Sequence, residues 1–275
     1  MKRILITGAN SYIGTSVEKY LAQWPDQYQV DTIDMVDGSW REKSFSGYNS
    51  VFHVAGIAHQ DSGKITEERK QLYYKVNTDL TIETAKKAKA EGVGQFIFMS
   101  SIIVYGASAR MGEKKVITQD TAPAPIGAYG DSKLQAEKGI NLLSDESFRV
   151  CILRPPMIYG SGCKGNYRLL EKAALLLPIF PDIKNERSML SIDNLCGFLK
   201  KAIDQDEKGV FFPQDPEYVC TSQMVKEIAE QNGKRIRLVK WFNPILRALS
   251  GKIAVIDKVF GNLTYSRLLE TGQKQ

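Results

Sequence analysis

Short apolar runs alternate with longer stretches of helical apolar spacing along the first half of the chain. The apolar runs, which predict strands, lie at Lys2–Thr7, Gln29–Ile33, Val51–Ala55, Phe96–Met99 and Val150–Leu153. Helical spacing of apolar residues predicts helices between them, at Tyr12–Trp24, Ile65–Glu91 and Tyr129–Leu143. Nearly continuous apolar strands are typical of a sheet covered on both faces, and alternation of strand and helix indicates a parallel sheet with right-handed crossovers.

The pattern becomes looser after residue 156. It predicts three helices and two short strands, at Leu169–Leu177, Asp193–Ile203, Ser222–Asn232, Arg187–Ser191 and Val210–Phe212. We therefore expect an α/β fold whose first and larger domain comprises residues 1–156. A smaller C-terminal lobe, residues 157–275, is expected to be partly interleaved with that core.

Composition excludes several classes of protein. With 43% apolar and 25% charged residues the chain is typical of a folded domain. No apolar stretch approaches the ~18 residues of a membrane span, and Met1-Lys2-Arg3 leads directly into a strand, so we expect no secretory leader and a cytoplasmic protein. The four cysteines have no C-x-x-C spacing and predict free thiols. Two histidines are too few for a typical metal site, so no metal is expected.

The net charge of +6 is unevenly distributed. Residues 1–225 hold 27 basic and 27 acidic side chains, whereas residues 226–258 hold eight basic and three acidic ones. A nucleic-acid-binding protein is not indicated, because the excess charge belongs to one C-terminal segment instead of the whole chain.

A glycine-bearing turn follows the first predicted strand. Gly8 and Gly14 bracket it, and we expect the loop to bind a pyrophosphate through backbone N–H groups at the start of a helix. The residues assigned to this cofactor contact are Gly8, Asn10, Ser11, Tyr12, Ile13 and Gly14.

The adenosine end of the cofactor is expected at the second strand. Asp34 stands at the end of that strand, 20 residues after Gly14, where a carboxylate can accept hydrogen bonds from ribose hydroxyls and favours NAD over NADP. Asp37 is a rival for this position, and the nearby Arg41 leaves NADP open.

Tyr129 and Lys133 form a Tyr-x-x-x-Lys pair on a predicted helix, where the i, i+4 spacing places both on one face. A tyrosine with its ordinary pKa of ~10 is a poor base, and a nearby ammonium would lower that pKa. The strand Phe96–Met99 ends in Ser100-Ser101, at the edge of the sheet where ligands bind in such folds.

These motifs resemble those of the extended short-chain dehydrogenases/reductases, in the NAD-dependent epimerase/dehydratase family. The shared features are the loop Thr7–Gly14, the S-S-x-x-V-Y-G stretch Ser100–Gly106 and the Tyr-x-x-x-Lys pair; Ser11 stands where the family usually has glycine. The resemblance implies a Rossmann fold, a doubly wound parallel sheet, with NAD or NADP as cofactor. It also implies catalytic roles for Ser101, Tyr129 and Lys133, with Lys133 orienting the ribose. Further cofactor contacts are implied at Ala55, Gly56 and Asn77.

The second half resembles family members that act on UDP-N-acetylhexosamines in surface-polysaccharide synthesis. The segments that carry this resemblance are Leu153–Gly160, Lys164–Asn166 and Arg187–Leu195. By resemblance, Asn166 would contact the diphosphate–sugar region and Arg187 the substrate diphosphate. The family's 4,6-dehydratases have Asp-Glu where this chain has Ile102 and Ile103. Two isoleucines move no protons, so dehydration is not expected.

Two reactions at C4 of a UDP-sugar fit this set of residues, a 4-keto reduction and a 4-epimerisation; the short substrate lobe slightly favours the reductase. The alternative is a non-catalytic dinucleotide-binding regulator or scaffold of the same fold. A homodimer is left open.

The basic segment 226–258 contains Trp241–Leu249, a mixture of apolar and basic residues. This composition suggests either a solvated face or a peripheral contact with an anionic membrane or a membrane-bound sugar transferase.

Overall fold

A parallel six-stranded sheet forms the centre of the computed structural model, which describes residues 1–57, 65–163 and 165–269. The strand order is β10-β6-β4-β3-β1-β2, and every neighbouring pair is parallel. The strands are β1 (Lys2–Thr7), β2 (Tyr28–Ile33), β3 (Ser50–His53), β4 (Gln95–Met99), β6 (Arg149–Leu153) and β10 (Gly209–Phe211). The predicted α/β fold with a Rossmann-like, doubly wound parallel sheet is confirmed.

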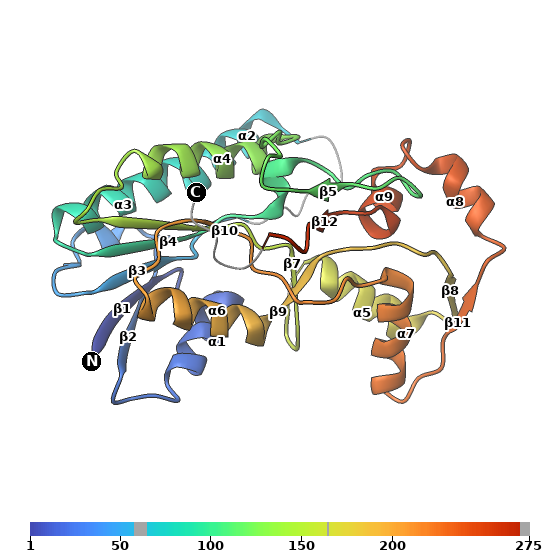
Figure 1. The fold of residues 1–275 in the computed structure, drawn as a ribbon, viewed down its shortest axis with the longest axis horizontal. Helices are drawn as coiled ribbons and strands as arrows, with labels where there is room; N and C mark the ends of the chain where they lie inside the picture. The colour runs from blue at the N-terminus through green and yellow to red at the C-terminus, as the bar shows by residue number, and fades with distance from the viewer. Residues whose placement is uncertain (58–64, 164, 270–275) are drawn as a thin grey trace.

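Helices cover both faces of this sheet (Figure 1). On one face lie α2 (Glu67–Tyr73), α3 (Leu80–Ala90) and α4 (Ala128–Asn141), and on the other α1 (Tyr12–Leu21) and α6 (Ile192–Asp204). Each face has its own apolar layer, so the strands are buried on both sides, as their continuous apolar runs predict.

The helix expected at Ile65–Glu91 is interrupted. It is divided into α2 and α3 by a π-helical turn, Tyr74–Asp79. Apolar periodicity does not reveal such a turn. A single wide turn changes the spacing between apolar residues by less than that spacing already varies along an ordinary helix. Turns of this kind are frequent at functional sites, and this one contains the predicted cofactor residue Asn77.

The sheet draws its last strand from beyond residue 156. β10 pairs with β6, and α6 packs against α1 through an apolar face that includes Leu195, Leu199 and Ile203. Residues 192–211 therefore belong to the same packed core as β1, although they follow the first elements of the lobe in sequence.

The rest of the C-terminal half forms the lobe at the other end of the long axis of the molecule (Figure 1). Its helices are α5 (Asn166–Leu176), α7 (Thr221–Gln231), α8 (Asn243–Leu249) and α9 (Ala254–Phe260). Three two-stranded parallel pairs accompany them: β8 (Ile179–Pro181) with β11 (Arg237–Val239), β7 (Met157–Tyr159) with β9 (Met189–Ser191), and β5 (Val116–Ile117) with β12 (Thr264–Tyr265). The sequence did not predict α8, α9 or most of these strands, because seven residues or fewer carry too little periodicity.

The buried His53 side chain makes its hydrogen bonds to neighbouring elements of the core. His53 at the end of β3 contacts Thr7 Oγ1 through Nδ1 (2.8 Å) and Thr81 Oγ1 through Nε2 (3.1 Å), and burial lowers its pKa to about 3. It is therefore a neutral cross-link between strands and helix.

The four cysteines lie inside the protein: Cys151, Cys163 and Cys196 are buried and Cys220 is half-buried. His59 lies outside the described residues. Among the helices that the structure describes, none has the length and apolarity needed to cross a bilayer.

Candidate active site

The predicted site residues of the first domain gather at the carboxyl edge of the sheet. Gly8 follows β1, Asp34 follows β2, Ala55 follows β3 and Ser101 follows β4. The chain order reverses between β1 and β3, since β2 lies on one side of β1 and all later strands lie on the other. In open α/β sheets the crevice at such a reversal point is where ligands bind.

The glycine loop is shaped by close backbone packing at this reversal point. Gly8 has φ +90°, and a Cβ on it would lie 2.9 Å from the backbone nitrogen of Ala55. Ser11 caps α1, with its Oγ accepting from the N–H of Gly14 at 3.0 Å. A Cβ on Gly14 would lie 2.6 Å from that oxygen. Both glycines are therefore required by the turn itself.

Ser11 changes how the loop meets an anion. As the N-cap residue, Ser11 accepts a hydrogen bond from the N–H of Gly14 through a lone pair of its Oγ. Its hydroxyl proton therefore stays available to donate. The N–H groups of Tyr12 and Ile13 belong to the first turn of α1 and have no acceptor within the helix. Together with the positive end of the helix they form a site for a phosphate. Asn10 precedes the cap with φ +63°.

Tyr12 connects the loop to the lobe. Its ring lies 3.6 Å from the position that a Cβ on Gly162 would take, and its hydroxyl lies 3.2 Å from the corresponding position on Gly160. The hydroxyl is buried and has no hydrogen-bond partner among the residues that the structure describes, and burial raises its pKa to about 12. Tyr12 is thus placed to position the start of the lobe against the loop.

The acidic position at the end of β2 is occupied by an exposed carboxylate. Asp34 accepts a hydrogen bond from the N–H of Val36 with one oxygen, at 2.8 Å. Asp37 instead binds Ser39, through its N–H (3.0 Å) and its hydroxyl (2.8 Å). The guanidinium of Arg41 is held by both carboxylate oxygens of Glu83. Asp34 is therefore the more available acceptor, and Arg41 already has an anionic partner.

Asn77, Gly56 and Lys133 meet behind the end of β3. The Asn77 carboxamide is fully buried; its oxygen accepts from the N–H of Ile57 (2.8 Å), and its nitrogen donates to Ile57 O and Ser132 Oγ (both 3.2 Å). A Cβ on Gly56 would lie 3.0 Å from Asn77 Oδ1 and 3.3 Å from Lys133 Nζ. Asn77 thus fixes the loop after β3 to α4. Its contact with a cofactor stays a prediction.

Ser101 and Tyr129 are brought together by a hydrogen bond between their side chains. The Tyr129 ring packs against the buried ring of Tyr73, with centroids 5.8 Å apart. The lowered pKa that we expected for Tyr129 is wrong for this structure. Burial raises the pKa to about 12, and the hydrogen bond from Ser101 offsets only part of that effect. The phenol is removed from the water that would stabilise a phenolate, and it is therefore held as a protonated acid.

Lys133 lies on the same helix as Tyr129 and is almost completely buried. Its ammonium donates to the carbonyl of Met99 at 2.9 Å and lies 4.7 Å from the centre of the Phe98 ring. Burial lowers its pKa to about 8, while the charge of Glu137 acts in the opposite direction. Lys133 is therefore charged at neutral pH but close to losing its proton, and Glu137 favours the charged form.

A buried ion pair behind Ser101, Tyr129 and Lys133 was missed by sequence reasoning. Arg154 donates to both oxygens of Glu137, with Nε and Nη2 at 3.1 and 2.6 Å, and donates to the Tyr105 hydroxyl at 2.6 Å. Ser100 also donates to Glu137, and the Tyr265 hydroxyl donates to the Arg154 carbonyl at 2.6 Å. The available signal was the spacing of Glu137, one helical turn beyond Lys133 on the same face.

Arg187 belongs to a second cluster, connected to the first by the segment from Ser101 to Ser108. Its Nη1 donates to Ser108 Oγ (3.2 Å) and to Gly261 O (2.9 Å), and burial lowers its pKa to about 10. Within the described ranges no carboxylate forms an ion pair with it. Burial lowers the pKa of Lys258, on α9, and the charge of Arg187 acts in the same direction. A buried guanidinium that no carboxylate of the described residues pairs with favours the binding of an anion.

The last residue of the basic segment, Lys258 on α9, is electrostatically coupled to Arg187, whose charge lowers the pKa of Lys258 in addition to burial. Seventy-one positions separate Arg187 from Lys258, so no local pattern could reveal this coupling. Asn166 is the first residue of α5, and Lys164 lies outside the described residues.

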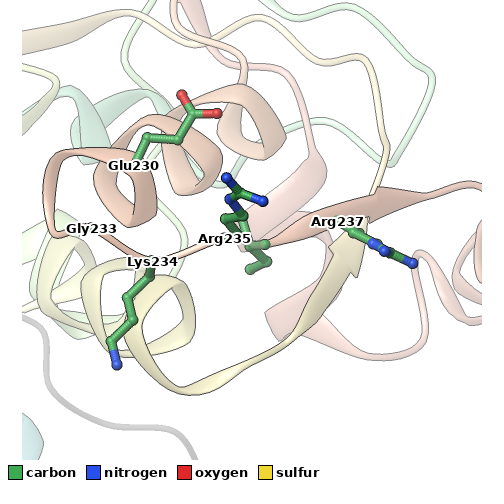
Figure 2. A pocket seen from close by; sticks show the side chains of 6 residues that line it. Glu230, Gly233, Lys234, Arg235 and Arg237 are labelled. Carbon is green, nitrogen blue, oxygen red and sulfur yellow. The ribbon is translucent and has the colours of Figure 1, made fainter.

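A surface pocket of about 510 Å³ lies elsewhere on the lobe, at the end of α7 and the start of β11. Figure 2 shows Lys234, Arg235 and Arg237 pointing in different directions from its lining. No predicted site residue lines it. Because its cations do not converge, it lacks the arrangement that a bound anion needs.

The carboxyl-edge cluster fits a bound dinucleotide. The Gly8 turn admits no side chain, the first turn of α1 presents N–H groups without intrahelical acceptors, Asp34 presents a carboxylate, and the Lys133 ammonium lies at the carboxyl end of β4. Backbone N–H groups at a helix start suit a pyrophosphate, and a carboxylate at the end of β2 suits ribose hydroxyls.

Replacing Gly8 with alanine is therefore expected to weaken cofactor binding by at least about tenfold, because the new methyl group would push the loop away from Ala55. Gly92→Ala is the matched control: Gly92 also has a positive φ (+79°), but a Cβ there meets nothing within 4 Å. Both changes introduce backbone strain, so both should lower the melting temperature. Fluorescence titration with NADH and NADPH should show weaker binding for Gly8→Ala alone; equal affinities of the two variants would contradict the packing argument.

Comparison with known proteins agrees with this geometry. The model of the NAD dependent epimerase/dehydratase family matches residues 4–211. The chain is 32% identical to UDP-glucose 4-epimerase of Vibrio cholerae over 287 positions, which cover 95% of this chain and 86% of that protein. It is 26% identical to the N-acetyl-α-D-glucosaminyl-diphospho-ditrans,octacis-undecaprenol 4-epimerase of Escherichia coli O157:H7 over 254 positions, covering 85% and 73%.

A solved structure shares the fold. The dTDP-4-dehydrorhamnose reductase of Bacillus anthracis, in complex with NADP, superposes with a TM-score of 0.74 at 18% identity, covering 100% of this chain and 95% of that one. The family match spans the sheet, the glycine loop and the Ser101–Tyr129–Lys133 cluster. The protein is an NAD(P)-dependent enzyme, and the chain belongs to the NAD-dependent epimerase/dehydratase family.

Proposed function

We propose that this enzyme changes the oxidation state or configuration at C4 of a UDP-N-acetylhexosamine, within the synthesis of a surface polysaccharide. The observation that carries the proposal is the hydrogen-bonded pair of Ser101 and Tyr129 next to the buried Lys133, at the carboxyl edge of the sheet. A serine hydroxyl, a phenol and an ammonium at one crevice can bind, polarise and protonate a sugar oxygen.

Ser101, Tyr129 and Lys133 each have a separate role in the proposed reaction. When bound, the nicotinamide cofactor supplies or accepts the hydride. Ser101 donates a hydrogen bond to the oxygen at C4 and holds it within reach of Tyr129. Tyr129, protonated because its pKa is raised, donates its proton to that oxygen when a ketone is reduced. Lys133 places its positive charge beneath the crevice, where it stabilises the phenolate that remains.

The Arg187 cluster supports a diphosphate-bearing substrate. A buried guanidinium that has no carboxylate partner among the described residues, and whose charge acts on a second cation, Lys258, is matched by a diphosphate. UDP-sugars and lipid-diphosphate sugars both carry that group. The named activities of the relatives from Vibrio cholerae and Escherichia coli support action at C4 of such sugars.

Epimerisation is the form of the reaction that we favour, because both of these relatives are named as 4-epimerases. Reduction of a 4-keto-sugar is the second candidate. It is favoured by the raised pKa of Tyr129, since a reductase needs only the proton-donating form whereas an epimerase must also withdraw a proton.

A product assay separates the two reactions. The purified enzyme would be given UDP-N-acetylglucosamine with catalytic NAD, and separately a UDP-4-keto-6-deoxy-N-acetylhexosamine with stoichiometric NADH or NADPH. Formation of UDP-N-acetylgalactosamine without net change in the cofactor is expected for the epimerase, and stoichiometric loss of absorbance of the reduced cofactor for the reductase. UDP-glucose is included as the competing substrate. No turnover of either N-acetylated sugar, with turnover of UDP-glucose, would overturn the assignment of the sugar.

A further inference from the structure

The outer edge of the lobe carries exposed apolar side chains among basic ones. We call this surface the distal patch and define it as residues 240–255, which comprise the loop before α8, α8 itself and the loop leading into α9. Figure 1 shows α8 at the end of the long axis, away from the central sheet. Its exposed apolar side chains are Trp241 (61% exposed), Ile245 (57%), Ile253 (41%) and Val255 (56%).

These exposed side chains are distinct from the residues that form the apolar core of the lobe. α8 already packs inward through Leu246 and Leu249, which lie against the apolar core of the lobe. Ile245 lies at the edge of that inward face and is exposed, and Trp241 stacks on Phe242 with ring centroids 3.6 Å apart. The apolar groups that face solvent are therefore additional to those needed for folding.

The charge of the distal patch is almost entirely positive. Lys240, Arg247 and Lys252 lie within it, and residues 240–258 contain a single acid, Asp257. The carboxylate of Asp257 is used internally: it accepts from Met111 N (3.2 Å), Gly251 N (2.7 Å) and Ser250 Oγ (2.5 Å). A partner of the patch therefore meets cationic groups and apolar groups but no free carboxylate from this segment.

We propose that the distal patch docks on the surface of an anionic phospholipid bilayer. Exposed tryptophan and aliphatic side chains interleaved with lysine and arginine are the composition of segments that lie in the membrane interface. Anionic headgroups complement the positive charge, and each basic residue near such a surface strengthens binding about fivefold. A protein partner is less well matched, because lysine is depleted in protein interfaces.

The docking geometry leaves the catalytic cluster accessible. The patch lies at the end of the molecule remote from the sheet, and α9 leads from Val255 toward Lys258 and the Arg187 cluster. The patch residues make none of the contacts described for Ser101, Tyr129 or Lys133. Loss of membrane binding should therefore leave turnover of a soluble substrate unchanged, which makes this inference separable from the proposed function.

Vesicle sedimentation tests the proposal with the full chain. Sucrose-loaded vesicles of phosphatidylcholine with phosphatidylglycerol should pellet the protein at about 0.02 M NaCl and release most of it at about 0.5 M, because salt screens the attraction. Vesicles of phosphatidylcholine alone should pellet little. The double variants Trp241→Ser/Ile245→Ser and Arg247→Gln/Lys252→Gln should each weaken partitioning at least about tenfold.

A matched variant controls for net charge. Lys86→Gln/Lys201→Gln removes two exposed lysines from helices of the sheet domain, and it should partition like the unaltered protein. Quenching by brominated lipid gives a second measurement: it should be strong for the unaltered protein and largely lost in Trp241→Phe, because Trp40 is fully buried and the half-buried Trp24 packs against the core of the sheet domain, away from the distal patch. Absence of binding at low salt, equal loss in the control, or binding that survives both patch variants would each overturn the proposal.

Discussion

Replacing Tyr129 with phenylalanine is expected to lower kcat by about 10²- to 10⁴-fold, the range that a positioned acid–base group contributes. The ring would keep its packing against Tyr73, so the change removes one hydroxyl and its hydrogen bond to Ser101. The loss of stability should be small, about 1 kcal/mol. Steady-state kinetics with the substrate identified by the product assay would measure the rate, and thermal unfolding would verify that the variant is folded.

Tyr48→Phe is the matched control for this experiment. Its hydroxyl donates to Asp31 at 2.8 Å, and its ring lies 4.5 Å from the guanidinium of Arg3, near the start of β1. That position is at the amino edge of the sheet, opposite the crevice. Its kcat should stay within about twofold of the unaltered enzyme, because no acid–base group is lost. Retention of more than a tenth of the activity by Tyr129→Phe would contradict the assignment of Tyr129 as the acid.

The second large effect is expected from the buried pair behind the site. Changing Glu137 to glutamine leaves the Arg154 guanidinium buried without an anion, which is expected to destabilise the fold by about 3–5 kcal/mol. Glu83→Gln offers a matched comparison, since Glu83 also binds an arginine through both oxygens but at the exposed surface. That pair should contribute less than about 1 kcal/mol. Urea unfolding of both variants measures the difference.

Glu137→Gln should also change the pH dependence of the reaction. Because the charge of Glu137 raises the pKa of Lys133, its removal should lower that pKa further below about 8. Lys133 would then lose its proton at a lower pH, and the alkaline limb of the kcat/KM profile should move in the same direction. If Glu137 contributes only to stability, Glu137→Gln should be less stable but the alkaline limb of its kcat/KM profile should not move. That result would exclude an effect of Glu137 on the charge of Lys133.

A double variant separates the two effects. Glu137→Leu with Arg154→Met removes both charges and should be more stable than either single change, since no unpaired charge stays buried. If the double variant is destabilised by the sum of the two single changes, the ion pair is not coupled and the network argument is wrong.

The sequence by itself determined the parts of this protein that depend on neighbours along the chain. The glycine turn between β1 and α1 and the i, i+4 placement of Tyr129 and Lys133 follow from local geometry. The parallel sheet followed from alternating strands and helices with continuous apolar runs. These features involve hydrogen bonds and side-chain spacing within a few residues, which a single sequence displays directly.

Only the tertiary structure decided what depends on distant segments and on burial. Glu137 meets Arg154 across an element boundary, Lys258 on α9 is electrostatically coupled to Arg187, and β10 completes the sheet from beyond the first lobe elements. The direction of the Tyr129 pKa also came from structure: spacing placed an ammonium on the same helix face, but burial of the phenol raises the pKa by more than the hydrogen bond from Ser101 lowers it. Desolvation is set by every segment that packs around a group, and no local pattern of residues encodes it.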